Sequence, residues 1–99
     1  MSTPTPAGKT VLVVEDNATA RAALADLLQP EGFAVVPAAN GKDALVRLGE
    51  GLVPDLILLD LLMPVVDGWA FLQDLRRGFP GLLSVPIIVT TAVGIASRE

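Results

Sequence analysis

The chain has 99 residues, 52% of them hydrophobic, which is enough for one small domain with a packed core. Its 7 basic and 11 acidic residues give a net charge of −4, which argues against a nucleic-acid surface because phosphate binding needs a clustered basic face. Cysteine and histidine are both absent, which excludes disulfides and thiolate metal sites and leaves oxygen ligands, the kind that suits Mg²⁺.

Residues 1–8 are polar, contain two prolines and lack the apolar segment of a signal peptide. We therefore expect a flexible lead over 1–8 and a single domain over 9–99. The longest apolar stretch is interrupted by Asp60, so no uncharged run approaches the ~18 residues of a membrane span. These features favour a cytoplasmic protein without a membrane partner.

The first predicted strand, over residues 10–14, is a continuous apolar run, which is typical of a strand buried on both faces of a parallel sheet. A helix is predicted next, over residues 17–29. Asp16 or Asn17 can cap its start, and Pro30 helps to end it. Its apolar stripe is predicted at Ala20, Leu24, Leu27 and Leu28.

A second strand is predicted over residues 33–36. Pro37 directly after it indicates an edge position, because proline cannot donate a hydrogen bond to a neighbouring strand. A second helix is predicted to begin after Asn40 and to end at Gly49 or Gly51, since glycine commonly follows the last turn of a helix.

The rest of the chain continues the alternation, with a strand over 56–59, a helix from near Asp67 to Gly78 and a strand over 86–90. The third helix should bury Phe71, Leu72 and Leu75. The resulting order, βαβαβαβ, is typical of an α/β fold, in which helices cover both faces of a parallel sheet through right-handed crossovers.

Acids and a hydroxyl follow three of the four strands. Glu15 and Asp16 follow the first strand, Asp60 the third and Thr91 the fourth. The carboxyl ends of parallel strands form one edge of a sheet, and ligands of such sheets bind there. We therefore expect these side chains to face one cavity.

Three carboxylates this close repel one another, so at least one should have a raised pKa unless a cation intervenes. A divalent ion with oxygen ligands, such as Mg²⁺, removes that cost. Asp60 could then act as a nucleophile toward a phosphoryl group, and Thr91 could donate a hydrogen bond to a phosphoryl oxygen.

A purely structural role is the alternative for some of these acids. An acid at a strand end often caps the following helix, and Asp16 could do only that. Asp60 is harder to explain in this way, because it lies between Leu59 and Leu61 in an apolar run and unpaired acids are rarely buried.

The chain resembles the receiver domain of bacterial two-component response regulators in four motifs, from about residue 9 to the end. They are VLVVEDN at 11–17, DLILLD at 55–60, MPVVDG at 63–68 and PIIVTTA at 86–92. Four linked motifs in order are far more specific than any one of them.

This resemblance implies a flavodoxin-like, doubly wound α/β sheet with strand order 2-1-3-4 and, in the family, a fifth strand. It implies that a sensor histidine kinase, or a histidine phosphotransfer protein, donates a phosphoryl group from phosphohistidine to Asp60. Asp16 and Asp60 would bind Mg²⁺, with Glu15 acting through water and the backbone carbonyl of Leu62 as a further ligand. Thr91 would be the switch hydroxyl.

Two features depart from the family pattern. The family carries a lysine at the end of strand five, and this chain stops at Glu99 before any such residue. We therefore expect a domain that is incomplete at its C-terminus and a homo-oligomer that forms through the exposed edge of the strand at 86–90. Leu62 stands where many relatives have a polar side chain, and leucine cannot orient an attacking water, so we expect slow hydrolysis of an aspartyl phosphate.

The favoured function is a phosphorylation-controlled signalling switch, which takes part in phosphoryl transfer without being a metabolic enzyme. A pseudo-receiver, or a partner-binding fragment that is not competent for normal phospho-switching, is an alternative that the absent lysine leaves open. A phosphatase or phosphotransferase of the haloacid dehalogenase type is a weaker rival, because it needs a second acid at the position of Leu62.

Overall fold

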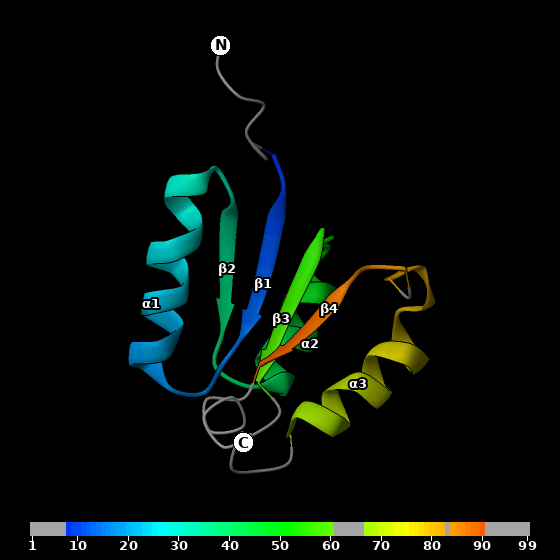
Figure 1. Cartoon of the computed structure of the whole chain (residues 1–99). Coiled ribbons are helices and arrows are strands. Elements are labelled where there is room, and N and C mark those ends of the chain that lie inside the picture. Colours follow the sequence, from blue (N-terminus) through cyan, green and yellow to red (C-terminus); the bar gives the residue numbers. More distant parts are fainter. Residues whose placement is uncertain (1–7, 61–66, 83, 91–99) are drawn as a thin grey trace, which may run out of the picture.

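A four-stranded parallel sheet forms the centre of the computed structural model, which describes residues 8–60, 67–82 and 84–90 (Figure 1). Its strands are β1 (Thr10–Val14), β2 (Ala34–Ala38), β3 (Leu56–Asp60) and β4 (Ile87–Thr90). They lie in the order β2-β1-β3-β4, all parallel, which confirms the predicted order 2-1-3-4. The described sheet therefore has β2 and β4 at its edges.

Three helices connect these strands, α1 (Ala18–Leu28), α2 (Gly41–Gly49) and α3 (Asp67–Gly78). Two short 3₁₀ turns follow α1 and α3, at Gln29–Glu31 and Pro80–Leu82. Helix α1 covers one face of the sheet, and α2 and α3 lie side by side on the other (Figure 1). None of the helices within the described residues is long and apolar enough to cross a membrane.

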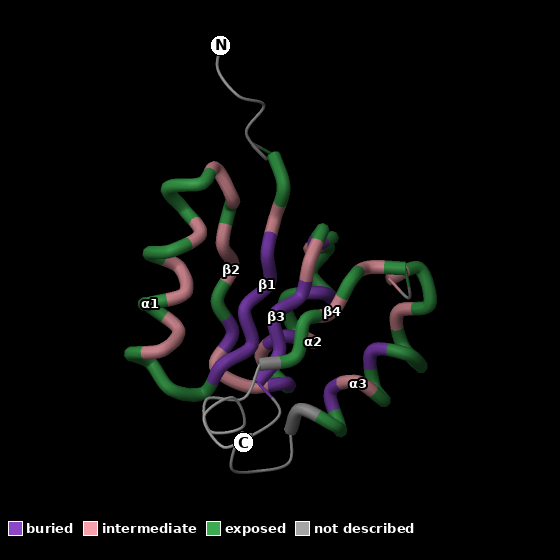
Figure 2. The backbone as a smooth tube through the Cα atoms, in the orientation of Figure 1, coloured by how far each residue is buried: buried purple, intermediate pink, exposed green. Residues whose placement is uncertain are grey.

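The larger core lies between the sheet and helices α2 and α3. Strands β1 and β3 run through its centre and are buried along most of their length (Figure 2). This burial follows from their continuous apolar runs, which cover both faces of each strand. The buried members of this core are Leu12, Val14, Ala38, Ala44, Leu48, Ile57, Leu59, Phe71 and Leu75.

The core under α1 is smaller, and it differs from the prediction at one position. Leu24 and Leu28 pack against it as expected, but Leu27 is 69% exposed. The half-buried face of α1 is rotated away from Leu27, and Arg21 and Ala25 lie on it instead. The spacing of apolar residues could not reveal this rotation, because Leu27 falls at a position that helical periodicity assigns to the same face as Leu24 and Leu28.

Strand β2 extends two residues beyond the prediction. Pro37 lies inside the strand, opposite Val13, and Ala38 ends it opposite Val14. A proline is tolerated here because β2 is an edge strand, as the sequence predicted.

Asparagine side chains begin both α1 and α2. The Asn17 Oδ1 atom accepts the Ala20 N–H at 2.8 Å, and the Asn40 Oδ1 atom accepts the Asp43 N–H at 2.7 Å. Each bond satisfies an amide that the helix itself leaves without a partner. The cap of α1 is thus Asn17, and Asp16 does not serve as its cap.

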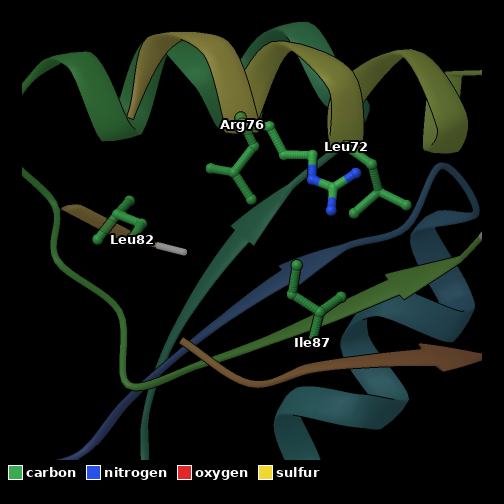
Figure 3. A pocket seen from close by; sticks show the side chains of 5 residues that line it. Leu72, Arg76, Leu82 and Ile87 are labelled. Carbon is green, nitrogen blue, oxygen red and sulfur yellow. The ribbon is translucent and has the colours of Figure 1, made fainter. Parts of the chain in front are cut away.

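A hydrophobic groove with a volume of about 520 Å³ lies between α3 and β4 (Figure 3). It is lined by Leu72, Leu75, Arg76, Leu82 and Ile87. None of the predicted site carboxylates lines this groove, so the chemistry predicted from the sequence has to be sought at the carboxyl edge of the sheet.

Candidate functional site

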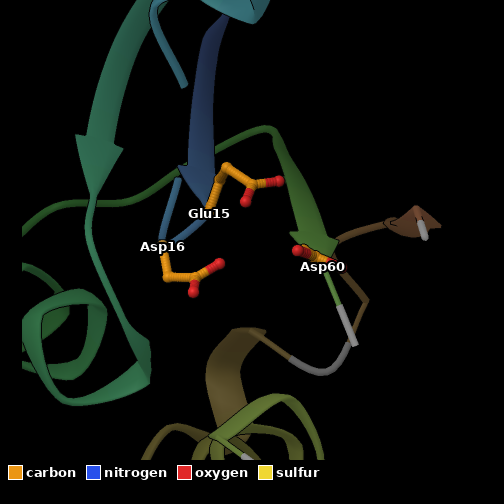
Figure 4. A group of neighbouring side chains, drawn as sticks. All are labelled: Glu15, Asp16 and Asp60. Carbon is orange, nitrogen blue, oxygen red and sulfur yellow. The ribbon is translucent and has the colours of Figure 1, made fainter. Parts of the chain in front are cut away.

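The carboxylates of Glu15, Asp16 and Asp60 meet at the carboxyl edge of the sheet (Figure 4). Glu15 and Asp16 directly follow β1, and Asp60 is the last residue of β3. The two strands are neighbours, so one carboxylate oxygen from each residue lies within 4.8 Å of the others. The expectation that these three carboxylates lie close together at one edge of the sheet is confirmed.

The three acids differ in their exposure to solvent. Glu15 and Asp60 are buried, with exposed fractions of 7% and 6%, whereas Asp16 is exposed. Burial raises the pKa of Glu15 above its ordinary value, the N–H of Asn17 lowers it by hydrogen bonding to the carboxylate, and the charge of Asp60 raises it again. One of the carboxylates thus has the raised pKa that was predicted, but burial is its largest cause and repulsion from Asp60 contributes less.

The donor set fits a hard divalent cation. All three side chains offer carboxylate oxygens, and Mg²⁺ prefers one or two carboxylates together with waters. One carboxylate oxygen from each residue lies within 4.8 Å of the others, so the three side chains would hold such an ion together with its waters. An ion there would also offset the charge that raises the pKa of Glu15.

Two hydrogen bonds donated by main-chain amides hold the turn that carries Glu15 and Asp16. The Glu15 N–H donates to the Ala38 carbonyl at 3.0 Å, which ties the turn to the end of β2. The Asn17 N–H donates to the Glu15 Oε2 atom at 3.0 Å, and the same residue caps α1. The acidic turn is therefore joined both to the sheet and to the start of a helix.

Arg21 is a residue of this site that the sequence analysis missed. Its Nη1 atom donates to the Glu15 carbonyl oxygen at 2.8 Å and lies 3.4 Å from the Asp16 carbonyl oxygen. The one available signal was a cation in the first turns of a helix, where the helix dipole disfavours positive charge. That signal shows neither which atoms the side chain contacts nor that they are carbonyls.

Other predicted site residues are placed only in part. Leu62 and Thr91 lie outside the described residues, as do residues 63–66 of the MPVVDG motif. Asp67 begins α3, close to its predicted start. Thr90 pairs with Asp60 in the sheet, so β4 ends at the same edge as the acids.

Comparison with known proteins decides what kind of domain carries this site. Residues 11–97 match the family model of the response regulator receiver domain. The chain belongs to the response regulator receiver family. Membership of this family agrees with the predicted resemblance and sets aside the haloacid dehalogenase alternative.

Curated relatives of this receiver domain are much longer proteins. It is 39% identical over 89 residues to the probable transcriptional regulator ycf27 of Guillardia theta, covering 89% of this chain and 33% of that protein. It is 34% identical over 88 residues to the sensor histidine kinase CheAY of Helicobacter pylori, covering 88% of this chain and 11% of that protein. The chain thus spans about a third of the length of the ycf27 relative.

Solved receiver structures share the fold. The chemotaxis response regulator CheY4 of Vibrio cholerae matches with a TM-score of 0.73 and 31% identity, covering 82% of this chain and 66% of that one. The response regulator TrrA of Thermotoga maritima, in complex with Mg²⁺-BeF, matches with a TM-score of 0.71 and 30% identity, covering 91% and 76%. The receiver domain described here therefore has the flavodoxin-like fold that was predicted.

Proposed function

We propose that this receiver domain is a phosphorylation-controlled signalling switch that accepts a phosphoryl group on Asp60 in the presence of Mg²⁺. The observation that carries the proposal is the meeting of three carboxylates, within 4.8 Å of one another, at the carboxyl edge of the sheet of a receiver-family domain. The proposed donor is a phosphohistidine of a sensor histidine kinase or of a histidine phosphotransfer protein. The proposed location is the cytoplasm, as expected from the sequence.

The proposed transfer exchanges one bond to phosphorus for another. A carboxylate oxygen of Asp60 forms a P–O bond as the P–N bond of phosphohistidine breaks, and the electron pair of that bond returns to the imidazole nitrogen. When bound, Mg²⁺ supplies positive charge beside the phosphoryl oxygens. Asp16 and Asp60 would hold the ion directly, Glu15 through water, and the Leu62 carbonyl would complete the protein ligands.

Two further parts of the proposal come from the resemblance alone. Thr91 is proposed as the hydroxyl that responds to the phosphoryl group, and the side chain of Leu62 as the reason for slow hydrolysis. Both residues lie outside the described residues, so support for their roles rests on the sequence alone, on the place of Thr91 in the PIIVTTA motif and on the place of Leu62 two residues after Asp60. Replacing Leu62 with asparagine tests the second role, because a faster loss of the phosphoryl group is expected.

The proposal predicts that Asp60→Asn abolishes phosphorylation. The wild-type chain, incubated with acetyl phosphate and Mg²⁺, should gain the mass of one phosphoryl group by intact mass spectrometry, and EDTA should prevent the gain. Asp60→Asn should gain nothing, because the amide oxygen is a far weaker nucleophile than a carboxylate. Trp69, which is the only tryptophan and is exposed at the start of α3, gives a second readout when beryllofluoride is added.

Asp55→Asn is the matched control for this experiment. Asp55 precedes the opposite end of the same strand, where its Oδ2 atom accepts the Thr10 N–H at 2.8 Å, and asparagine can still accept that bond. The control should be phosphorylated like the wild type. Equal phosphorylation of Asp60→Asn would contradict the proposal. A wild-type chain that binds Mg²⁺ but gains no mass would favour the partner-binding alternative.

A further inference from the structure

We propose that Arg21 is a positioning residue, which fixes the turn between β1 and α1 and thereby holds the Glu15 and Asp16 carboxylates in the arrangement that binds a divalent cation. This inference rests on the proposed function, since it names a residue that prepares the same site. The half-buried Arg21 side chain returns from the second turn of α1 to the main chain of the acidic turn.

The contacts of Arg21 fall where regular secondary structure supplies no donor. Glu15 and Asp16 lie between the last residue of β1 and the cap of α1, and the first helical bond is accepted one residue later, where the Arg21 N–H donates to the Asn17 carbonyl at 2.9 Å. The Arg21 guanidinium serves the two preceding carbonyls, at 2.8 and 3.4 Å. A main-chain carbonyl near the surface gains a charge-assisted bond in this way.

Holding these carbonyls fixes the direction of the attached side chains. The peptide groups on both sides of Asp16 are tied, one through the Glu15 carbonyl and one through the Asp16 carbonyl, so the Cα–Cβ direction of Asp16 is set by the turn. Asp16 is exposed and lacks the packing that orients Glu15 and Asp60. Among the three acids, it therefore depends most on its backbone for its position.

Arg21 does this without an ion pair to the acids beside it. Within the described part of the chain, no salt bridge joins Arg21 to Glu15 or Asp16, and the guanidinium bonds the main chain of both. The guanidinium therefore does not compete with a cation for these two carboxylates, although the Glu15 Oε2 atom accepts the Asn17 N–H. A positive charge at this end of a helix opposes the helix dipole, and the nearby carboxylates offset that cost.

Positioning and simple electrostatics predict opposite results when Arg21 is replaced with methionine. Removing a positive charge beside three carboxylates would by itself strengthen Mg²⁺ binding. Loosening the turn would weaken it, and removing the outer partners of metal ligands typically costs about tenfold or more in affinity. The sign of the change in Kd for Mg²⁺ therefore distinguishes a positioning role from a charge effect.

The experiment measures Mg²⁺ binding to the full chain by isothermal titration calorimetry, with Mg²⁺ as the only ligand. We expect Arg21→Met to raise the Kd about tenfold. Arg21→Lys should give an intermediate Kd, because an ammonium can still donate to the nearer carbonyl. Arg77→Met, which removes an exposed arginine paired with Asp74 on α3, should leave the Kd unchanged.

Amide hydrogen exchange in EDTA gives a readout that needs no metal. Arg21→Met should speed the exchange of the Asn17 and Ala20 amides, which bond within the same turn, while amides of β3 keep their protection. Equal or tighter Mg²⁺ binding by Arg21→Met overturns the inference, as does unchanged exchange. The proposed function fails separately, if the wild-type chain binds no Mg²⁺ or is not phosphorylated on Asp60.

Discussion

The ionised form of Glu15 is the unfavourable one in the metal-free domain. Burial and the charge of Asp60 hold its pKa above the ordinary value in the folded state, and unfolding would restore that value. The stability that this group contributes is therefore complete below the unfolded pKa and is lost as the pH rises through the folded pKa. Above the folded pKa, the metal-free domain is destabilised by the Glu15 charge.

Glu15→Gln should stabilise the metal-free domain at neutral pH. Glutamine removes one of three adjacent charges and can still accept the Asn17 N–H, so the free energy of unfolding should rise by on the order of 1 kcal/mol. Urea unfolding in EDTA at several pH values measures this change, and the difference from wild type should shrink as the pH falls. Mg²⁺ should stabilise the wild type more than this variant.

Glu31→Gln is the control for that series, since Glu31 is an exposed acid in the 3₁₀ turn after α1. Its unfolding should follow the wild type at every pH. A Glu15→Gln domain that is less stable than the wild type in EDTA at neutral pH would contradict the electrostatic account.

The acids of the site were predictable from the sequence, but the hydrogen bonds from Arg21 that hold their turn were not. Each acid ends an apolar run, and the parallel arrangement of the strands brings such ends together whatever the side-chain details. The bonds of Arg21 depend on where α1 sits over the sheet, and the prediction had placed Leu27 on the buried face. A helical period defines a stripe but not its rotation to within one residue.

The start of α2 joins two side chains to two amides. The Asn40 Oδ1 atom accepts the Asp43 N–H at 2.7 Å, and the Asp43 Oδ2 atom accepts the Ala39 N–H at 3.2 Å. The arrangement differs from a capping box, because Asp43 accepts the amide of Ala39, one residue before the cap, and not the amide of Asn40 itself. These bonds fix the start of α2, the helix that buries Ala44 and Leu48 in the larger core.

Asn40→Ala should lower the free energy of unfolding by about 1 kcal/mol, the usual cost of losing a helix cap. Chemical denaturation measures the loss. Asn40→Asp should recover most of it, because aspartate also accepts at this position, and the exposed Lys42→Ala on the same turn should have little effect. If Asn40→Ala unfolds at the wild-type denaturant concentration, the cap does not stabilise α2.

Element positions followed closely from turn and cap residues, and strand order did not follow from them. Asn40 precedes the first residue of α2, and Gly78 is the last residue of α3, in both the prediction and the structure. Alternation of strands and helices predicts a parallel sheet, but it does not say which strands are neighbours. The order 2-1-3-4 came from the family resemblance, and the pairing of β1 with both β2 and β3 confirms it.

The helices among the described residues cover the sheet unevenly. Helix α1 packs over β1 and β2, while Ile88 of β4 pairs with Leu58 and remains 49% exposed. Its neighbour Val89 is 46% exposed, and no strand among the described residues pairs with the outer edge of β4. An apolar strand at an open edge can pair with the same strand of a second copy.

We expect this 99-residue chain to self-associate through β4. Size-exclusion chromatography with light scattering should show a dimer or larger species for the wild type and a shift toward monomer for Ile88→Lys. Leu27→Lys, at a leucine on α1 that is more exposed than Ile88, should not shift the mass. A wild-type chain that stays monomeric at every concentration tested would contradict the association.

The polarity of the sheet also separates the two rims of the molecule for practical use. All strands are parallel, so the candidate chemistry gathers at one rim, and the loop before β3 belongs to the opposite rim. Val53 lies in that loop and is 69% exposed, and the chain has no cysteine. Val53→Cys would therefore give the molecule a single thiol, through which a dye or a surface can be attached away from the acids.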